Sequence, residues 1–142
     1  MKTRRAFTVM EAVVVLSVFL VTVIALTPFV NMARQRSKRL QCVDNLRRIS
    51  LGLHAYAAGH DGAFPAKLEE LYPDYVADRD TFDCPAGRLK GTPAEPEYMY
   101  ATGLSEASGL KDVVVEDLPE NHKKQGENAL RLDGSIEWVR AK

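Results

Sequence analysis

The sequence predicts an α+β fold, in which a long N-terminal helix (a membrane stem plus an amphipathic half) packs on a small antiparallel β-sheet. Three observations predict it. Residues 12–30 carry no charge and are mostly apolar, as expected of a helix that crosses a membrane. Residues 31–50 contain neither proline nor glycine, so the same helix can continue beyond the membrane. Several segments near the C-terminus are rich in strand-forming residues.

An acidic residue stands at the head of the apolar stretch. Glu11 immediately precedes the 19 uncharged residues from Ala12 to Val30. A carboxylate in hydrocarbon costs at least about 2–3 kcal/mol, and the stretch offers it no partner. Removal of the short basic leader, residues 1–6, would create a new ammonium group on Phe7. On a neighbouring copy of the chain that group could neutralise Glu11, so the pattern indicates a protein that polymerises out of a membrane.

The residues around this glutamate resemble a known processing signal. Residues 5–16, Arg-Ala-Phe-Thr-Val-Met-Glu-Ala-Val-Val-Val-Leu, resemble the class III signal of type IV pilins and type II secretion pseudopilins. In that family a prepilin peptidase cuts before a phenylalanine and N-methylates it. The resemblance implies cleavage between Ala6 and Phe7, N-methylation of Phe7, and roles for Glu11 and Pro28 in filament assembly. Ala6 departs from the family, which usually has glycine there, but alanine is the next smallest side chain and we expect cleavage to survive.

Two simpler interpretations explain less of the sequence. A secretory signal peptide has an apolar core of about 7–15 residues followed by a small-residue cleavage site, whereas this run is longer and Asn31-Met32-Ala33 matches such a site poorly. A plain membrane anchor needs about 20 apolar residues, which fits the length but explains neither Glu11 nor Pro28. Pro28 could also simply kink the helix, which is compatible with a role in assembly.

The resemblance divides the chain into three parts. It implies a leader peptide at residues 1–6, a transmembrane and filament-core helix at residues 7–30, and a head domain at residues 31–142. The basic leader favours a cytoplasmic N-terminus, but four bases also follow the span: Arg34, Arg36, Lys38 and Arg39. Charge alone leaves the topology open, and those bases could contact lipid headgroups or acidic neighbours, or simply be solvated. The family's peptidase acts on the cytoplasmic face, so we expect a single-pass bacterial inner-membrane protein with its head in the periplasm.

Formal charge gives no sign of a nucleic-acid partner. The chain has 19 basic and 19 acidic residues, and without the leader it has 16 basic and 19 acidic residues. Neither balance is typical of a protein that binds nucleic acid. We therefore expect no nucleic acid among its partners.

The amphipathic half of the helix follows the stem. Apolar residues recur there at a spacing of three to four, which predicts one buried face: Leu40, Val43, Leu46, Ile49 or Ser50, Leu53 and Tyr56. Gly52 inside it costs about 1 kcal/mol relative to alanine if exposed. Gly59 and Gly62 predict the end of the helix. The whole helix would then have about 50 residues and a length of about 75 Å.

A second segment resembles the region after the long helix in the major pseudopilins of type II secretion. The matching residues are Asn45-Leu46-Arg47-Arg48-Ile49, then Tyr56, then Gly62-Ala63-Phe64-Pro65. They predict a helix end, a turn that Pro65 restricts and a short helix that covers the sheet.

The C-terminal part predicts antiparallel strands. The strand-forming segments are residues 97–101, 112–116, 128–132 and 135–139. Asp133-Gly134 between the last two predicts a two-residue hairpin turn. This hairpin resembles that of a large bacterial group of prepilin-like proteins, in which a histidine precedes the Asp-Gly pair. His122 stands eleven residues before Asp133, and no chemistry is assigned to it.

The two cysteines, Cys42 and Cys84, are candidates for a disulfide. An exported head meets an oxidising compartment, and the bond would close a loop of about 40 residues and contribute about 2–4 kcal/mol. The alternative is two separate buried thiols. A zinc site is not expected, because two cysteines so far apart, with no close pair of histidines, lack the usual spacing.

Nothing in the sequence indicates an enzyme. It shows no glycine-rich phosphate loop, no paired metal-binding histidines and no nucleophile motif, and we expect His54, His60 and His122 to be structural or solvated. The resemblance makes calcium a possible cofactor, because major pseudopilins bind it near their last strands. Oxygen ligands are available in one acidic region: Asp112, Glu116, Asp117, Glu120 and Asn121. Their spacing matches no calcium motif, and a solvated acidic loop is the alternative, so no metal ligands are assigned.

These patterns together predict a structural subunit of a type IV pilus-like or type II secretion pseudopilus filament. Its expected partners are further copies of itself, other pilins, prepilin peptidase, the inner-membrane assembly platform and the lipid bilayer. After assembly it would lie in a periplasmic or cell-surface filament. The alternatives are a minor or initiating pilin, a membrane-anchored binding module that does not polymerise, and an anchored enzyme.

Processing of the N-terminus tests the resemblance. We expect the mature protein to begin with N-methylated Phe7, which intact mass and N-terminal sequencing would show. Ala6→Gly should leave cleavage intact, whereas the bulky Ala6→Leu should block it. A mature chain that begins at Met1, or after Ala33, would contradict the pilin interpretation.

Overall fold

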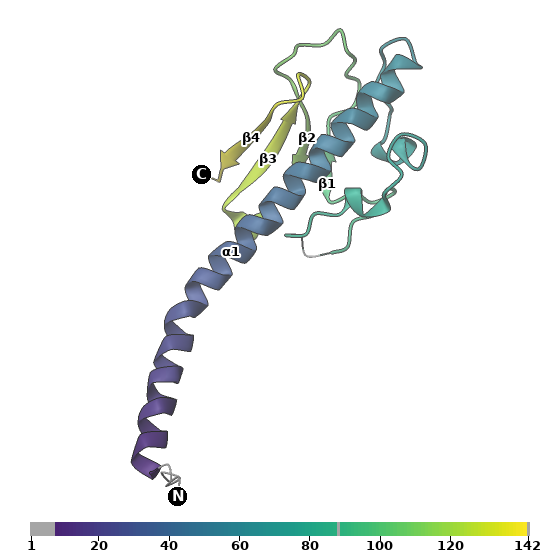
Figure 1. Cartoon of the computed structure of the whole chain (residues 1–142). Helices are drawn as coiled ribbons and strands as arrows, with labels where there is room; N and C mark the ends of the chain where they lie inside the picture. The colour runs from purple at the N-terminus through teal and green to yellow at the C-terminus, as the bar shows by residue number, and fades with distance from the viewer. Residues whose placement is uncertain (1–7, 88, 142) are drawn as a thin grey trace, which may run out of the picture. The chain divides into compact units, whose positions relative to one another are not determined.

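The computed structural model describes residues 8–87 and 89–141. As predicted, one long helix, α1 (Val9–Ala58), accompanies a small antiparallel sheet of four strands (Figure 1). The chain separates into two compact units, residues 1–34 and residues 35–142, and each contains part of α1. The expected cleavage site at Ala6 and Phe7 lies outside the described residues.

The first unit contains the N-terminal part of α1. The helix begins after Thr8, whose hydroxyl oxygen accepts a hydrogen bond from the backbone N–H of Glu11 at 3.3 Å, with the Thr-x-x-Glu spacing of a capping box. Three hydroxyls farther along each donate to a backbone carbonyl of the preceding turn at 2.8 Å, namely those of Ser17, Thr22 and Thr27. Because their protons are satisfied inside the helix, these hydroxyls suit an apolar solvent. By length and composition, α1 can cross a membrane, and its most apolar window has no buried residue.

The second unit carries the sheet. Its strands are β1 (Tyr98–Tyr100), β2 (Val113–Asp117), β3 (Gly126–Arg131) and β4 (Ile136–Arg140). They lie in the order β1-β2-β3-β4, each antiparallel to the next. Short 3-10 helices stand between the longer elements, namely η1 (Leu68–Leu71), η2 (Arg79–Phe82) and η3 (Asn121–Lys124). All of the predicted strands are present, with ends that differ from the prediction by one or two residues.

The core of this unit lies between the C-terminal half of α1 and the sheet. Leu46 and Ile49 of the helix are fully buried, and so are Val115 of β2 and Leu130 of β3. These side chains belong to one apolar cluster, which Phe82 of η2 also joins. Burial of a large aliphatic side chain contributes about 1.5–3 kcal/mol, so this cluster holds the helix and the sheet together.

Leu40 does not belong to the buried face, contrary to the prediction. Its side chain is 60% exposed, whereas Cys42 is fully buried. Each residue turns an α-helix by about 100°, so Leu40 lies about 120° around the helix from Leu46. The buried face follows a different set of residues: Cys42, Leu46, Ile49, Gly52, Leu53 and Ala57.

The β3–β4 hairpin turns where it was predicted to turn, but its loop is longer. The N–H of Arg131 donates to the carbonyl of Ser135 at 2.9 Å, and the N–H of Gly134 donates to the carbonyl of Arg131 at 3.0 Å. Three residues therefore lie between Arg131 and Ser135, rather than two. A two-residue turn of the expected type needs positive φ at two successive residues, and in this turn only Gly134 has one, at 79°.

Gly52 is buried on α1 because the opposing segment packs directly on its backbone. A Cβ atom at this position would lie 2.6 Å from Cγ2 of Val76 and 3.6 Å from Cδ1 of Leu71. The first distance is a steric clash, and Val76 is β-branched and has little freedom to move away. Glycine here serves close packing.

Gly52→Ala should lower the free energy of unfolding by about 1–2 kcal/mol, because overpacking outweighs the gain in helix propensity. Denaturant unfolding of the full chain in detergent would measure it. Adding Val76→Ala to Gly52→Ala should restore part of the lost free energy of unfolding. A double-mutant cycle would report this as an interaction energy between the two positions. Gly59→Ala is the matched control, since its Cβ would meet nothing closer than 3.7 Å. Equal stabilities of Gly52→Ala and Gly59→Ala would contradict this account of the packing.

Candidate functional site

A disulfide joins α1 to the segment that precedes β1. Cys42 and Cys84 are bonded; their Cα atoms are 5.5 Å apart, and the two residues are 42 positions apart in the sequence. Of the two arrangements that the sequence allowed, the structure therefore shows the disulfide. Next to it, Nδ2 of Asn45 donates to the backbone carbonyl of Asp83 at 2.8 Å. The helix thus holds this irregular segment by a covalent bond and by hydrogen bonds from Asn45 and Arg48.

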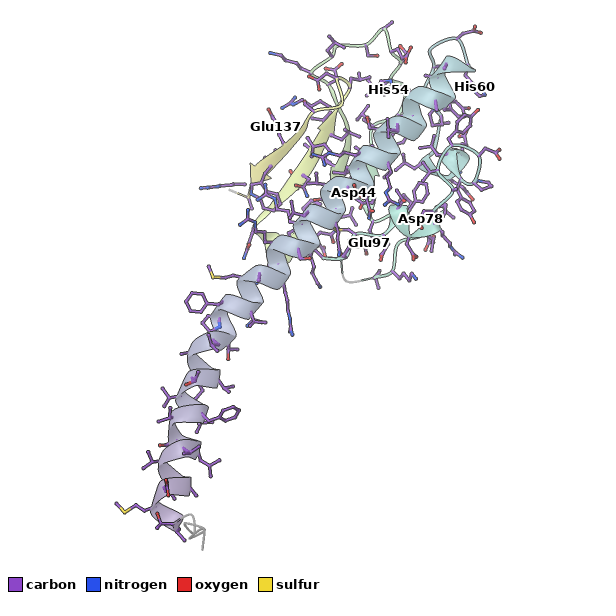
Figure 2. The ribbon with its side chains drawn as sticks, viewed as in Figure 1. Asp44, His54, His60, Asp78, Glu97 and Glu137 are labelled. Carbon is purple, nitrogen blue, oxygen red and sulfur yellow. A yellow bond between two sulfur atoms is a disulfide. The ribbon has the colours of Figure 1, made fainter. Side chains whose placement is uncertain are left out.

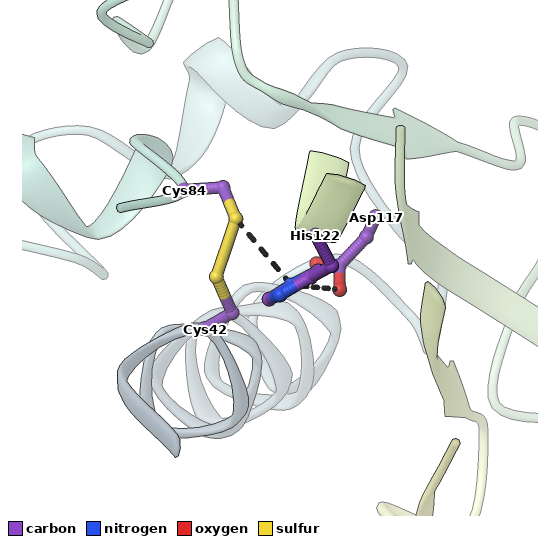
Figure 3. A group of neighbouring side chains, drawn as sticks. All are labelled: Cys42, Cys84, Asp117 and His122. Carbon is purple, nitrogen blue, oxygen red and sulfur yellow. Dashed lines mark hydrogen bonds and ion pairs between the residues drawn. A yellow bond between two sulfur atoms is a disulfide. The ribbon is translucent and has the colours of Figure 1, made fainter. Parts of the chain in front are cut away.

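A buried carboxylate lies beside the disulfide (Figure 3). Asp117, the last residue of β2, is fully buried. Its Oδ2 accepts hydrogen bonds from the backbone N–H and the side-chain amide of Asn128, at 2.9 and 2.6 Å. Within the described part of the chain, its Oδ1 has no hydrogen-bond partner. Burial of a carboxylate costs several kcal/mol unless charges or hydrogen bonds compensate, so this group marks a site where another interaction is expected.

His122 of η3 stands between this carboxylate and the disulfide. Its Nε2 lies 3.0 Å from Oδ2 of Asp117 and 3.7 Å from Sγ of Cys84. Its side chain is only 5% exposed. The backbone φ of His122 is 51°, in the left-handed region, which costs about 1–3 kcal/mol for a residue other than glycine. The surrounding structure holds the imidazole in the interior in spite of that cost.

An aromatic ring packs against the histidine, and a guanidinium group lies over that ring. The rings of His122 and Trp138 meet edge to face, with centroids 5.5 Å apart. Cζ of Arg39 lies 3.8 Å from the centroid of the Trp138 ring, within the range of a cation–π contact. Burial lowers the pKa of Arg39 from its ordinary value, and the negative charge of Asp117 opposes that shift. Arg39 therefore supplies positive charge near the buried carboxylate.

Four of these side chains form what we call the buried cluster, namely Cys42, Cys84, Asp117 and His122. One potential ligand atom from each lies within 4.8 Å of all the others. Sequence reasoning missed the cluster, because its members come from four segments and only the cysteines were paired in advance. The single hint was the spacing of His122 from the Asp-Gly turn, to which no chemistry was assigned.

The candidate calcium ligands of the acidic region lie in different surroundings. Asp117 faces the buried cluster. Nδ2 of Asn121 donates to the carbonyl of Glu97 at 3.3 Å, and Oδ2 of Asp112 accepts from the N–H of Gly109 at 3.1 Å. In the described residues, these acids form no group of three that could share an ion.

An open groove of about 580 Å³ lies along the exposed side of α1 in the second unit. Asp44 and Asp78 line it (Figure 2), and Arg48 bridges them at 3.1 and 3.0 Å. Lys90 similarly pairs with Asp80 at 3.3 Å. Such exposed pairs contribute about 0–1 kcal/mol each. Bases therefore already pair with three of the acids that line the groove.

The remaining histidines lie near the C-terminal end of α1 (Figure 2). Nδ1 of His54 is 3.2 Å from a carboxylate oxygen of Glu106. The ring of His60 stacks on that of Tyr56 with centroids 3.8 Å apart. Both histidines therefore have structural partners at the surface.

The predicted assembly residues lie in the first unit. Glu11 is in the first turn of α1 and its side chain is exposed. Pro28 lies inside the helix. The large apolar side chains from Val9 to Met32 are between 47 and 83% exposed. The unit thus presents an uncovered apolar helix with one carboxylate near its start.

Comparison of the chain with protein-family models, with curated proteins and with solved structures found no match.

Loss of the disulfide should lower the free energy of unfolding by about 2–4 kcal/mol, because the bond closes a long loop. The measurement is thermal unfolding of the full chain in detergent with a metal chelator, before and after reduction. A variant with both Cys42→Ser and Cys84→Ser should melt at the lower temperature whether or not reductant is present, which controls for effects of the reductant itself. Identical melting of oxidised and reduced wild-type protein would show that the bond does not stabilise the fold.

Proposed function

We propose that the chain is a structural subunit of a filament of the type IV pilus or type II secretion pseudopilus class. Prepilin peptidase removes residues 1–6 and methylates Phe7. The stem then holds the head at the periplasmic face of a bacterial inner membrane, until the assembly platform draws the subunit into a filament with other copies. The role is mechanical, either extrusion of secreted proteins or formation of a surface fibre.

The observation that carries this proposal is one charge on an otherwise apolar, uncovered helix. Glu11 is the only ionisable residue between Val9 and Met32, and the apolar side chains around it are exposed in the single chain. A lipid bilayer could cover the apolar surface, but it would leave the carboxylate without a partner. A second copy of the chain can cover the same surface and also supply an ammonium group from its mature N-terminus.

The disulfide supports a head that lies outside the cytoplasm. The bond between Cys42 and Cys84 is buried in the second unit. Disulfides persist in oxidising compartments such as the bacterial periplasm and are rare in the cytosol. This agrees with the topology that the processing signal implies.

Glu11 has one local role that must be separated from assembly. Its backbone N–H bonds to the hydroxyl of Thr8 at 3.3 Å, and a glutamate at this position can complete a capping box and complement the helix dipole. Glutamine also serves in a capping box but carries no charge. Glu11→Gln therefore keeps the cap and removes the carboxylate.

Both Glu11→Ala and Glu11→Gln should be processed and accumulate in the membrane, yet fail to enter filaments. Without the carboxylate, each docking subunit would bury an unpaired ammonium group at a cost of about 3–5 kcal/mol. The measurement is the amount of subunit in sheared, pelleted filaments relative to the membrane fraction. Ser17→Ala, an uncharged change in the same helix, is the control and should assemble normally.

The outcomes separate the candidate functions. Normal assembly of Glu11→Ala would contradict the proposed ion pair between the Glu11 carboxylate and the Phe7 ammonium group of a neighbouring copy. Failure of Glu11→Ala with normal assembly of Glu11→Gln would assign the glutamate to helix capping. If wild-type protein is processed but never enters filaments, the chain is a membrane-anchored binding module instead.

A further inference from the structure

The second unit buries a complete set of metal-ligand side chains that the filament role does not use. Two sulfurs, one imidazole nitrogen and one carboxylate oxygen of the buried cluster lie within 4.8 Å of one another. They come from α1, from the segment before β1, from the end of β2 and from η3 (Figure 3). A disulfide alone does not require a buried histidine and a buried carboxylate beside it.

We propose that, when its disulfide is reduced, the head binds one Zn²⁺ ion through the four side chains of the buried cluster. The zinc site and the disulfide are then alternative states of the same two sulfur atoms. This proposal does not depend on filament assembly.

The geometry already approaches that of a tetrahedral site. Zinc binds thiolate sulfur at about 2.3 Å and nitrogen or oxygen at about 2.0–2.2 Å, which sets neighbouring ligand atoms about 3.3–3.8 Å apart. Here Sγ of Cys84 lies 3.7 Å from Nε2 of His122, and that nitrogen lies 3.0 Å from Oδ2 of Asp117. All four ligand atoms lie within 4.8 Å of one another. Once the sulfur–sulfur bond is broken, the two sulfurs must move apart to about 3.8 Å, the spacing of two tetrahedral thiolates.

The donor set and its surroundings suit zinc. Thiolate and imidazole ligands favour zinc over calcium or magnesium, which prefer oxygen. Oδ1 of Asp117 is buried without a hydrogen-bond partner among the described residues, so it is the oxygen of this carboxylate that is left to bind a cation. Asn128 holds Oδ2 by two hydrogen bonds, as outer-shell groups commonly orient a metal-binding carboxylate.

Charge also balances within the cluster. A zinc ion with two thiolates, one carboxylate and a neutral imidazole carries one net negative charge. Arg39, whose guanidinium group lies over the ring of Trp138, provides one positive charge nearby. In the disulfide state the thiolate charges are gone, and the carboxylate keeps His122 and Asn128 as partners.

The exchange between the two states balances in atoms and electrons. Reduction by a dithiol breaks the sulfur–sulfur bond, gives two cysteine thiols and converts the reductant to its disulfide. Zinc binding then releases the two thiol protons. In reverse, the two bound thiolates pass two electrons to an incoming disulfide, which leaves as two thiolates. The bond between Cys42 and Cys84 re-forms, and Zn²⁺ is released with its charge unchanged.

Metal titration of the untagged full chain in detergent tests the proposal. The protein is reduced with a phosphine, which breaks the disulfide, and titrated with Co²⁺ as a spectroscopic probe. We expect thiolate-to-cobalt charge-transfer absorption, the visible bands of tetrahedral cobalt, and displacement of the cobalt by one equivalent of Zn²⁺. The oxidised chain should show none of these bands.

Variants then test the two ligands that are not sulfur. Asp117→Asn keeps the shape of the carboxylate, and His122→Asn keeps a residue that tolerates left-handed φ. Each should weaken cobalt binding by more than the roughly 10- to 100-fold that loss of an outer-shell group costs. His60→Asn changes a surface histidine outside the cluster and should bind cobalt like wild type. Formation of the disulfide on reoxidation shows which variants still fold.

Three results would contradict the proposed zinc site. The first is a reduced wild-type chain without thiolate-to-cobalt absorption. The second is unchanged affinity in folded Asp117→Asn and His122→Asn, which would mean that the sulfurs bind metal adventitiously. The third is equal metal uptake by the oxidised chain. If neither variant folds, the wild-type spectrum decides, because octahedral cobalt bands would exclude the proposed ligand set.

Discussion

One constraint governs the described chain: the first part of α1 is apolar and exposed, whereas its second part must pack into the core of the second unit. In the first unit, the side chains of α1 are apolar and exposed, and its hydroxyls bond back to the helix. In the second unit, the same helix buries Leu46, Ile49 and Leu53 in the core of the head. No other described helix is longer than four residues, so no other described helix could replace α1 in either unit. The stem and the head are therefore built on one continuous α-helix.

The head is a small fold that needs more than its apolar core. Its sheet has four short strands, and small domains commonly add covalent or metal links because little surface is buried. The disulfide provides such a link between α1 and the segment before β1. The polar groups of Asp117, His122 and Asn128 fill the adjacent interior, where their mutual hydrogen bonds offset the cost of burial. Redox state and metal occupancy would act on this link without changing the stem.

The sequence was sufficient for features that depend on local patterns. The uncharged run predicted an apolar helix long enough to cross a membrane. The absence of proline and glycine predicted its continuation, and strand-forming runs predicted each strand to within two residues. Cys42 and Cys84 could be paired because the chain contains only two cysteines. These predictions succeeded because helix propensity, strand propensity and cysteine count are each read from a few neighbouring residues or from composition.

Features that depend on tertiary contacts were missed or misplaced. Leu40 is three residues before Val43, as expected for a helical face, but the buried face of α1 lies about 120° around the helix from it, so Leu40 is exposed. The β3–β4 loop has three residues instead of the predicted two, because Asp133 does not take the positive φ that the two-residue turn requires. The buried cluster could not be foreseen, since the left-handed backbone of His122 and the end of β2 bring its members together over long sequence distances.

The central claim is that the carboxylate of Glu11 pairs with the mature N-terminus of a neighbouring subunit. An apolar carbodiimide can join such a pair in assembled filaments by a direct amide bond. Filaments grown from mixed light and heavy isotope-labelled subunits would then show whether the bond crosses between chains. We expect mass spectrometry to find a cross-linked peptide that joins light Phe7 to heavy Glu11, and the converse peptide. Cross-links found only within one chain, or none at these residues in intact filaments, would contradict it.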